Sequence, residues 1–367
     1  MKTVYAFMNS YTQGKSGGDM AFIEIFKRIK NIELTIITST LGKKLCQDNN
    51  LKADFLITTK EIGFKNIILT YFKRIARGIS LGIELKVGDI LYATSDALPD
   101  TMPVFFLKIK NKKTKWIQKI FHLIPKERFL SHWSQKISFF LTKKLADVVI
   151  VDNDQLKMDL AKMGFPKNKL FVNHLGVDFD YFKKILPSKI SYDGIFMARL
   201  HHSKGIFDLV QIWKNVVEKL PKVKLAIIGQ GEQKVVEKLT EEIKSNHLEN
   251  NIDLLGYLEN VQAFSLIKAA KLFIFPSHEE GFGLVIIEAL ACGTPVIAYD
   301  LLAYNHTFKP TITTISLNDH KQFSTMIYNL LMNERGRKKV IPTNKFLINR
   351  FSSWDRVAKK EVYLFDH

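Results

Sequence analysis

Short apolar runs alternate with longer mixed segments along the first half of the chain. The apolar runs cover residues 4–8, 34–37, 90–93, 116–121 and 148–151. Residues 18–30 have helical periodicity, and the other intervals have the length that a crossover between parallel strands needs. The first half therefore predicts an α/β domain with a parallel sheet.

The same alternation restarts after a polar, proline-bearing bridge at residues 183–191. The predicted strands are residues 194–198, 225–228, 252–255, 272–275 and 295–298, and the predicted helices are residues 205–219, 233–244, 261–270 and 284–291. This order is typical of a doubly wound parallel sheet. We therefore predict two Rossmann-like domains, residues 1–183 and 184–348, that face a central cleft.

Length and composition agree with two domains. The 367 residues are 46% hydrophobic, enough for two separate cores. The two cysteines, Cys46 and Cys292, lack the spacing of a disulfide framework or a zinc site, which favours a reducing, cytoplasmic setting. Residues 4–8 are too short for a signal sequence, and charges interrupt every candidate membrane span.

The chain is strongly basic, with a formal charge of +18. Residues 101–150 alone hold eleven Lys or Arg against two Asp or Glu. A positive charge concentrated in one stretch predicts an anionic partner surface.

Residues 273–298 carry the densest chemical signal, in the order strand, loop, helix, turn, strand. The loop lies where open α/β sheets bind ligands, and Gly281 and Gly283 let its backbone approach one closely. The helix that follows begins near Leu284. Since a helix N-terminus offers unpaired N–H groups and partial positive charge, it predicts a diphosphate site.

Two carboxylates flank this helix start. Glu280 precedes the helix and Glu288 is about five residues into it, a rise of roughly 7 Å at about 1.5 Å per residue. Carboxylates so spaced can accept hydrogen bonds from hydroxyls at both ends of a nucleotide sugar. The alternative is a capped helix with one surface acid.

Residues 273–298 closely resemble the signature of the fourth family of retaining glycosyltransferases (glycosyl transferases group 1), which have the GT-B fold. Residues 197–205 are similar to the family element in which an Arg and a Lys hold the donor phosphates, and Arg199 and Lys204 match those positions. Two cations there can neutralise a departing diphosphate. The alternative is ordinary surface cations.

The resemblance extends to other donor contacts. It implies that Gly256 and Tyr257 flank the donor base, and that the loop from Gly281 to Leu284, including Phe282, binds the donor. The first loop, with Gly17 and Gly18, is similar to the family loop that faces the donor. His122 matches the histidine beside the transferred sugar, and residues 349–367 resemble the tail that crosses back to the first domain.

Two motif-like stretches are assigned no chemistry. Residues 14–16 read Gly-Lys-Ser, but a phosphate-binding P-loop needs a glycine where Asn9 stands. Asp-x-Asp triplets occur at residues 152–154 and 178–180. In another transferase fold, triplets of this type bind a metal and a nucleotide. Here we interpret them as turn residues and expect no metal site.

Residues 64–79 read as a basic amphipathic helix, and residues 108–144 interleave lysines with aromatic residues. These two stretches predict docking on an anionic membrane surface. Core helices with a solvated charged face are an equally weighted alternative.

The sequence thus predicts a cytoplasmic, metal-independent, retaining glycosyltransferase, peripheral on the inner face of the membrane. It would use a nucleotide diphosphate sugar, with UDP favoured, no other cofactor, and a glycan or lipid-linked acceptor. Glu280 would position the sugar, Glu288 the ribose, and His122 would line the reaction centre. A nucleotide-sugar epimerase of the same fold is one rival. A basic nucleic-acid-binding protein is another, although no nucleic-acid-binding motif is present.

Overall fold

The computed structural model describes residues 2–11, 16–60, 66–342, 346–348, 351 and 353–366. Contacts divide the chain into two units, Met1–Gly176 with Trp354–His367, and Val177–Ser353. The division falls before residue 183 because helix α7 (Phe179–Lys184) packs within unit 2. The ring of Phe182 on α7 lies 4.8 Å from that of Phe264.

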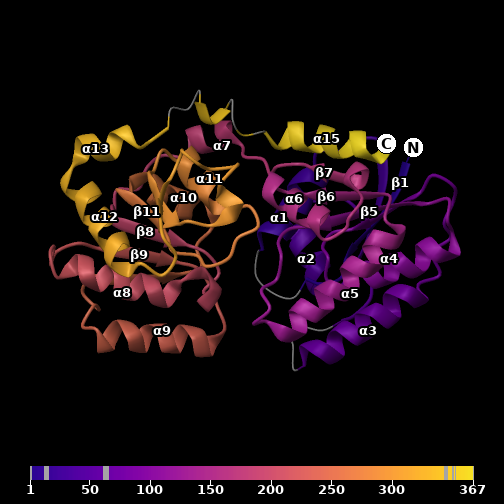
Figure 1. Ribbon diagram of the computed structural model, residues 1–367, viewed down its shortest axis with the longest axis horizontal. Helices are drawn as coiled ribbons and strands as arrows, with labels where there is room; N and C mark the ends of the chain where they lie inside the picture. The colour runs from indigo at the N-terminus through magenta and orange to yellow at the C-terminus, as the bar shows by residue number, and fades with distance from the viewer. Residues whose placement is uncertain are drawn as a thin grey trace. The chain divides into compact units, whose positions relative to one another are not determined.

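Unit 1 is built on a parallel sheet in the order β3-β2-β1-β4-β5-β6-β7. Its strands are β1 (Lys2–Met8), β2 (Ile32–Thr38), β3 (Asp54–Ile57), β4 (Ile90–Ala93), β5 (Lys115–Ile120), β6 (Val148–Val151) and β7 (Leu170–Val172). Its helices are α1 (Gly17–Phe26), α2 (Thr40–Asp48), α3 (Ile67–Ser80), α4 (Leu98–Lys110), α5 (Phe129–Leu145), α6 (Asp154–Lys162) and α15 (Trp354–Asp366). Figure 1 shows α3, α4 and α5 running side by side.

Unit 2 repeats this architecture with the sheet order β10-β9-β8-β11-β12-β13. Its strands are β8 (Gly194–Met197), β9 (Leu225–Ile228), β10 (Ile252–Gly256), β11 (Leu272–Phe275), β12 (Val296–Tyr299) and β13 (Thr313–Ile315). Its helices, besides α7, are α8 (Ile206–Val217), α9 (Gln233–Ser245), α10 (Asn260–Ala269), α11 (Leu284–Ala291), α12 (His320–Met332) and α13 (Glu334–Lys339). The prediction of two doubly wound parallel sheets is confirmed.

Three strands were not predicted from the sequence: β3, β7 and β13. Each is the outermost strand of its sheet and only three or four residues long. Central strands such as β6 and β11 are buried along their whole length and read as continuous apolar runs. Edge strands are covered less completely, so their sequences carry a weaker signal.

The last helix, α15, belongs to unit 1 and packs against α1. It buries Glu361 completely, and that carboxylate accepts hydrogen bonds of 2.5 Å from Tyr92 of β4 and from Asn173 just after β7. The Lys119 ammonium lies 3.9 Å from Glu361 and 3.5 Å from Asp152. A buried charge network therefore fastens the end of the chain to the sheet of unit 1.

Within the described residues, no helix is both long and apolar enough to cross a membrane.

Candidate functional site

The strand order of unit 2 reverses between β8 and β11, which are adjacent and parallel. Successive crossovers therefore leave on opposite faces of the sheet, and the loops at the carboxyl ends of these two strands diverge. Ligands of open α/β sheets bind at such a switch point. The loop after β8 supplies Arg199 and Lys204, and the loop after β11 supplies Glu280.

Lys204 and Glu280 meet across this switch point. The Lys204 ammonium donates a 2.6 Å hydrogen bond to Oε1 of Glu280 and a 3.3 Å bond to the carbonyl of Glu279. The hydroxyl of Ser277 donates to the same Glu280 oxygen at 3.2 Å. The Lys204 and Glu280 side chains are 20% and 12% exposed, so each remains open to a ligand. From the sequence, Lys204 was expected to hold the donor phosphates and Glu280 to position the sugar. In the structure the two side chains bind each other.

A glycine makes this meeting possible. Gly205 has φ +67°, and a Cβ at this position would lie 1.7 Å from the carbonyl oxygen of Pro276. The backbones after β8 and β11 are therefore in direct contact. The carbonyl of Ser203 accepts a 2.9 Å bond from the backbone N–H of His278, which fixes the two loops together. Glycine is thus required at position 205, next to Lys204.

Helix α11 begins beside this pair with unpaired backbone donors. Gly283 is its N-cap, has φ +87°, and contributes no side-chain cap. Among the described residues, none accepts a hydrogen bond from the backbone N–H of Leu284 or Val285. Exposed donors at a helix N-terminus favour an anion. The helix start thus has the character of a phosphate site.

Aromatic side chains support the helix start from the interior. Phe282 is 3% exposed, and its ring packs 5.6 Å from that of Phe308. Tyr304 and Phe308 also approach the Cα of Gly283 closely enough to contact a Cβ there. The Phe282 ring therefore faces the core of unit 2, and its predicted donor contact stays a prediction. Leu284 and Gly281 are half-buried at the surface of the loop.

Glu288 lies on α11, one turn beyond the helix start. No described residue donates a hydrogen bond to its carboxyl group, and burial raises its pKa to about 8. A carboxyl group that lacks partners in the protein is suited to accept hydrogen bonds from a ligand. This environment fits the predicted ribose contact, which stays a prediction.

The remaining donor-side candidates of unit 2 are at the same edge of the sheet. Arg199 is exposed, two residues after β8, and no described residue accepts a hydrogen bond from its guanidinium. Gly256 ends β10 with φ +66°, and Tyr257 is 41% exposed. Their assignments also stay predictions.

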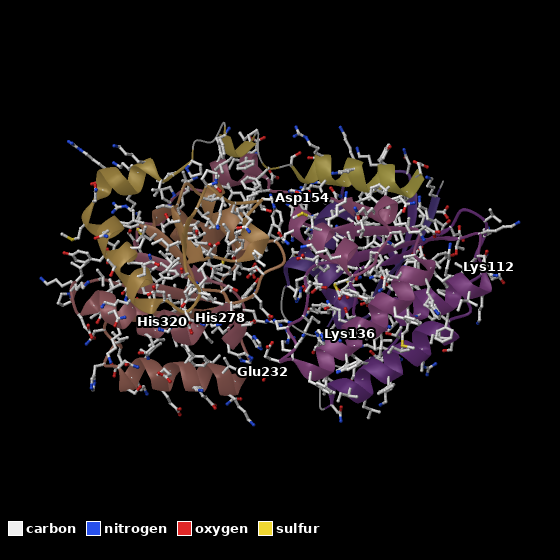
Figure 2. All side chains as sticks on the ribbon, in the orientation of Figure 1. Lys112, Lys136, Asp154, Glu232, His278 and His320 are labelled. Carbon is white, nitrogen blue, oxygen red and sulfur yellow. The ribbon has the colours of Figure 1, made fainter. Side chains whose placement is uncertain are left out.

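A charged cluster behind the signature loop was missed by sequence reasoning. One carboxylate oxygen of Asp208 accepts hydrogen bonds from His278 at 2.9 Å, Tyr299 at 2.8 Å and His320 at 3.1 Å. Figure 2 labels His278 and His320, which come from different elements of unit 2. Burial acts to raise the Asp208 pKa, but these bonds outweigh it and lower the pKa to about 2. The Asp208 bond also raises the pKa of His278. The cluster holds the loop that carries Glu280.

The start of α1, with Gly18, packs against the residue before His122 in unit 1. A Cβ on Gly18 would lie 2.8 Å from the ring of Phe121, so the start of α1 packs against the residue that precedes His122. The His122 carbonyl accepts a 2.8 Å bond from Gln135, whose amide also donates to Asp96 at 2.6 Å. Gly17 opens α1. Residues 12–15, which include the first part of the predicted glycine loop, lie outside the described residues.

The Asp-x-Asp triplets have structural roles. Asp152 pairs with Lys119, and Asn153 caps helix α6. Asp178 caps helix α7 by accepting from the backbone N–H of Tyr181. Over the described ranges, no group of three or more His, Cys, Asp or Glu side chains could hold a metal ion.

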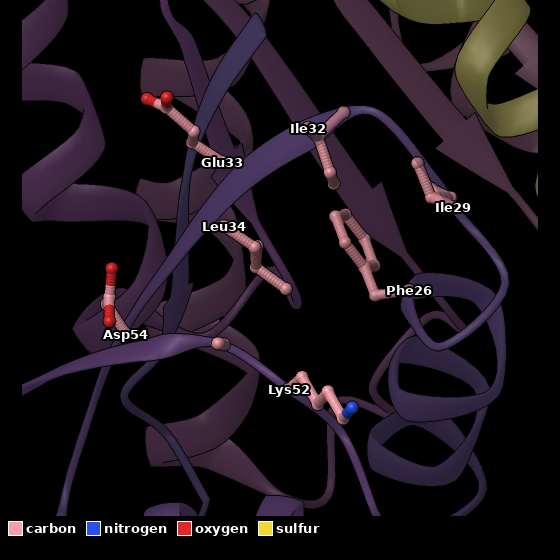
Figure 3. Close-up of a pocket in the computed structure, with 8 residues that line it drawn as sticks. Phe26, Ile29, Ile32, Glu33, Leu34, Lys52 and Asp54 are labelled. Carbon is pink, nitrogen blue, oxygen red and sulfur yellow. The ribbon is translucent and has the colours of Figure 1, made fainter. Parts of the chain in front are cut away.

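A hollow in unit 1 lies away from every predicted site residue. Figure 3 shows Glu33, Lys52 and Asp54 around it, together with the apolar side chains of Phe26 and Leu34. It is at the amino ends of β2 and β3, whereas ligands of such sheets bind at the carboxyl ends. We assign it no function.

The chain is similar to known glycosyltransferases. Residues 179–345 match the family described as Glycosyl transferases group 1. Over its whole length the chain superposes on the crystal structure of Anabaena Alr3699/HepE in complex with UDP and glucose, with a TM-score of 0.80, 16% identity and complete coverage of both chains. Most of unit 2 is therefore similar to glycosyltransferase group 1 domains, and the chain has the GT-B fold.

Two relatives extend the comparison. The chain is 32% identical over 257 residues to an uncharacterized glycosyltransferase of Methanocaldococcus jannaschii, MJ1059, covering 64% of this chain and 62% of the relative. It is 24% identical over 357 residues to the capsular polysaccharide biosynthesis glycosyltransferase CapM of Staphylococcus aureus, covering 89% of this chain and 88% of CapM. The chain thus spans less than two thirds of the archaeal relative.

Proposed function

We propose that the protein is a retaining glycosyltransferase of the fourth family, which moves a sugar from a UDP-sugar to a glycan or lipid-linked acceptor in cell-surface polysaccharide synthesis. The observation that carries the proposal is the contact of Lys204 with Glu280 beside the uncapped start of α11, at the switch point of the unit 2 sheet. The match to the group 1 family supports the reaction class. UDP is favoured because the HepE structure contains it.

In this proposal the donor diphosphate lies against the backbone N–H groups of Leu284 and Val285. Lys204 and Arg199 neutralise the charge that develops on it as the sugar leaves. Glu280 positions the sugar, and Lys204 orients that carboxylate through their 2.6 Å bond. These groups balance the diphosphate charge without a metal ion.

The acceptor hydroxyl attacks the anomeric carbon on the face from which the diphosphate departs, and the leaving phosphate accepts the hydroxyl proton. The configuration is thereby retained, and no protein side chain becomes a covalent nucleophile. His122 of unit 1 is proposed to line the reaction centre. The acceptor class is proposed from the name of the CapM relative, and the compartment is proposed to be the cytoplasm.

Donor binding tests the site directly. A panel of UDP-, GDP- and ADP-sugars is added to the protein while thermal unfolding is followed. At a hundred times its Kd, a matching donor stabilises the fold by about 2.7 kcal/mol, which raises Tm by roughly 5–10 °C. The shift is expected with UDP-sugars and is expected to be smaller in Glu280→Ala and Lys204→Ala. Equal shifts in the wild type and both variants would place the donor elsewhere.

The raised pKa of Glu288 makes donor affinity depend on pH. Ribose hydroxyls donate hydrogen bonds to a carboxylate, so the complex favours ionised Glu288, while the unliganded group has a pKa of about 8. Binding therefore releases a proton below pH 8, and affinity rises with pH. Raising the pH from about 6.5 to 8.5 is expected to lower the Kd for a UDP-sugar about 25-fold.

Calorimetry at the two pH values measures this change, and UDP-glucose suits it because its diphosphate does not titrate in this range. Glu288→Gln keeps the size of the side chain and is expected to bind with the same, weaker affinity at both values. A wild-type Kd that does not change with pH would contradict the proposed ribose contact.

A further inference from the structure

Three helices on one side of unit 1 direct apolar side chains outward. Helices α3, α4 and α5 pack side by side, as Figure 1 shows. The exposed apolar residues are Ile67, Ile68, Leu69 and Phe72 on α3, Phe106 and Ile109 on α4, and Phe129, Leu130, Trp133, Ile137 and Phe140 on α5. We call these residues the α3–α5 face. Phe64 and Lys65, which belong to the sequence-predicted helix, lie outside the described residues.

Helix α5 has the reverse of the usual amphipathic orientation. A surface helix of a globular protein normally buries its apolar stripe. On α5 the apolar residues Trp133, Ile137 and Phe140 are spaced four and three apart and are 48–55% exposed. The buried residues of α5 are Gln135, Ser138, Phe139 and Thr142, of which three are polar.

The buried polar groups of α5 have partners, so the helix is held in this orientation. The Gln135 amide donates to Asp96, and its carbonyl oxygen accepts from the backbone N–H of Ile124. The Ser138 hydroxyl lies 2.9 Å from that of Thr101 on α4. Turning Trp133 and Ile137 inward would break these bonds and leave buried polar groups unpaired.

Helix α3 likewise buries polar residues and exposes apolar ones. Its buried residues are Thr70, Arg74 and Gly78. The Arg74 guanidinium donates to the backbone carbonyls of Asn9 and Tyr11 at 2.9 and 2.6 Å. Meanwhile Phe72 is 65% exposed. The two helices flank α4, and the three helices together expose eleven large apolar side chains. Monomeric soluble proteins seldom expose large apolar patches without a partner.

Basic side chains surround the α3–α5 face. Lys136 lies 4.7 Å from the Trp133 ring, and Lys144 lies 4.2 Å from the Phe140 ring. Figure 2 labels Lys136 on α5 and Lys112 just after α4. Between residues 101 and 145 the sequence has one acid, Glu127, and eleven Lys or Arg, of which Lys108 and Lys119 are buried and the other nine are not. Cations beside outward aromatic rings form the pattern of helices that lie in a membrane interface.

We propose that the α3–α5 face docks on the surface of an anionic lipid bilayer, with its apolar side chains among the acyl chains and its lysines on the lipid phosphates. Charge decides between occupants. A second copy of this chain, paired through the same face, would bring two strongly positive surfaces together. A nucleic acid would match the charge and leave the apolar residues uncovered. A bilayer with anionic headgroups would match the positive charge and also cover the apolar residues.

Trp133 makes docking measurable without a label. Of the four tryptophans, Trp116, Trp213 and Trp354 are at most 7% exposed, whereas Trp133 is 50% exposed. Vesicles of phosphatidylcholine with a third phosphatidylglycerol are expected to shift the emission of Trp133 to the blue, and brominated acyl chains are expected to quench it. Pure phosphatidylcholine vesicles and high salt are expected to weaken binding at least tenfold.

Variants locate the binding surface. Ile137→Ser with Phe140→Ser keeps Trp133 as the probe and is expected to lower vesicle binding at least tenfold, as is Lys136→Glu with Lys144→Glu. The matched control is Leu186→Ser with Ile190→Ser, which alters two apolar residues of unit 2 that are even more exposed, and it is expected to bind as the wild type does. Far-UV circular dichroism checks that each variant is folded.

Several outcomes would overturn the proposal: equal binding to neutral vesicles, unchanged binding by the face variants, or a lipid-free blue shift that grows with protein concentration together with a dimer mass by light scattering. Tighter binding to DNA than to anionic vesicles would also overturn it. Docking does not rest on the proposed transfer reaction, because donor binding to unit 2 is measured separately by thermal shift. Either proposal can therefore fail alone.

Discussion

Replacing Lys204 by alanine is expected to lower the rate of sugar release from the donor about 100- to 1,000-fold, the usual effect of losing one group that stabilises a developing anion. The Lys204 ammonium is held at the switch point by Glu280 and by the carbonyl of Glu279. A cation in that position interacts most strongly with the transition state, in which the departing diphosphate acquires charge. The loss is therefore expected mainly in kcat, with a smaller change in donor Kd.

The measurement is UDP release from the UDP-sugar that gives the largest thermal shift, with water as the acceptor. Glu280→Gln, which removes the charge and keeps the shape, is expected to slow release to a similar degree. The double variant is expected to be no slower than the worse single variant, because the two side chains act as one unit. The matched control is Lys222→Ala, an exposed lysine before the amino end of β9. A Lys204→Ala rate within threefold of the wild type would exclude the proposed role.

Replacing Lys119 by methionine is expected to destabilise unit 1 by about 3–5 kcal/mol, the usual cost of removing one partner from a buried ion pair. Lys119 is 3% exposed at its side chain, and its neighbours Asp152 and Glu361 are 1% and 0% exposed. Methionine fills the space but leaves two buried carboxyl groups without a cation. Because Glu361 is on α15, the last helix is expected to detach first.

The loss should shrink as the pH is lowered. Burial already raises the pKa of Asp152 to about 7 despite the opposing effect of Lys119, and removing that cation raises it further. An acid whose folded pKa exceeds its unfolded value binds more protons when folded, so stability falls as pH rises between the two values. Urea unfolding at about pH 5.5 and 8 measures this difference.

Lys44→Met, an exposed lysine on α2, serves as the control and is expected to change stability by less than about 0.5 kcal/mol. A Lys119→Met variant as stable as this control at pH 8 would show that the network contributes little.

The sequence by itself determined the architecture and the place of the candidate site. The central strands are buried on both faces, so they read as apolar runs, and all ten predicted strands are present. Loop residues at the carboxyl ends of adjacent parallel strands must meet at one edge of the sheet. The family resemblance selected Arg199, Lys204 and Glu280 before their distances were known, and this sheet geometry agreed with the selection.

Only the tertiary structure decided which side chains touch and which faces are covered. Asp208 is on α8, His278 is in the loop after β11, and His320 is on α12. Their spacing along the chain therefore does not predict the cluster. Lys119 and Glu361 are likewise far apart in sequence.

The amphipathic pattern of α3 and α5 has the same form whichever stripe faces inward. The sequence therefore left core helices and membrane helices equally open. Polar partners elsewhere in unit 1, such as Asp96 for Gln135 and the Asn9 carbonyl for Arg74, determine the orientation. Periodicity records which residues share a face of a helix, and the groups that pack against that helix determine which face is buried.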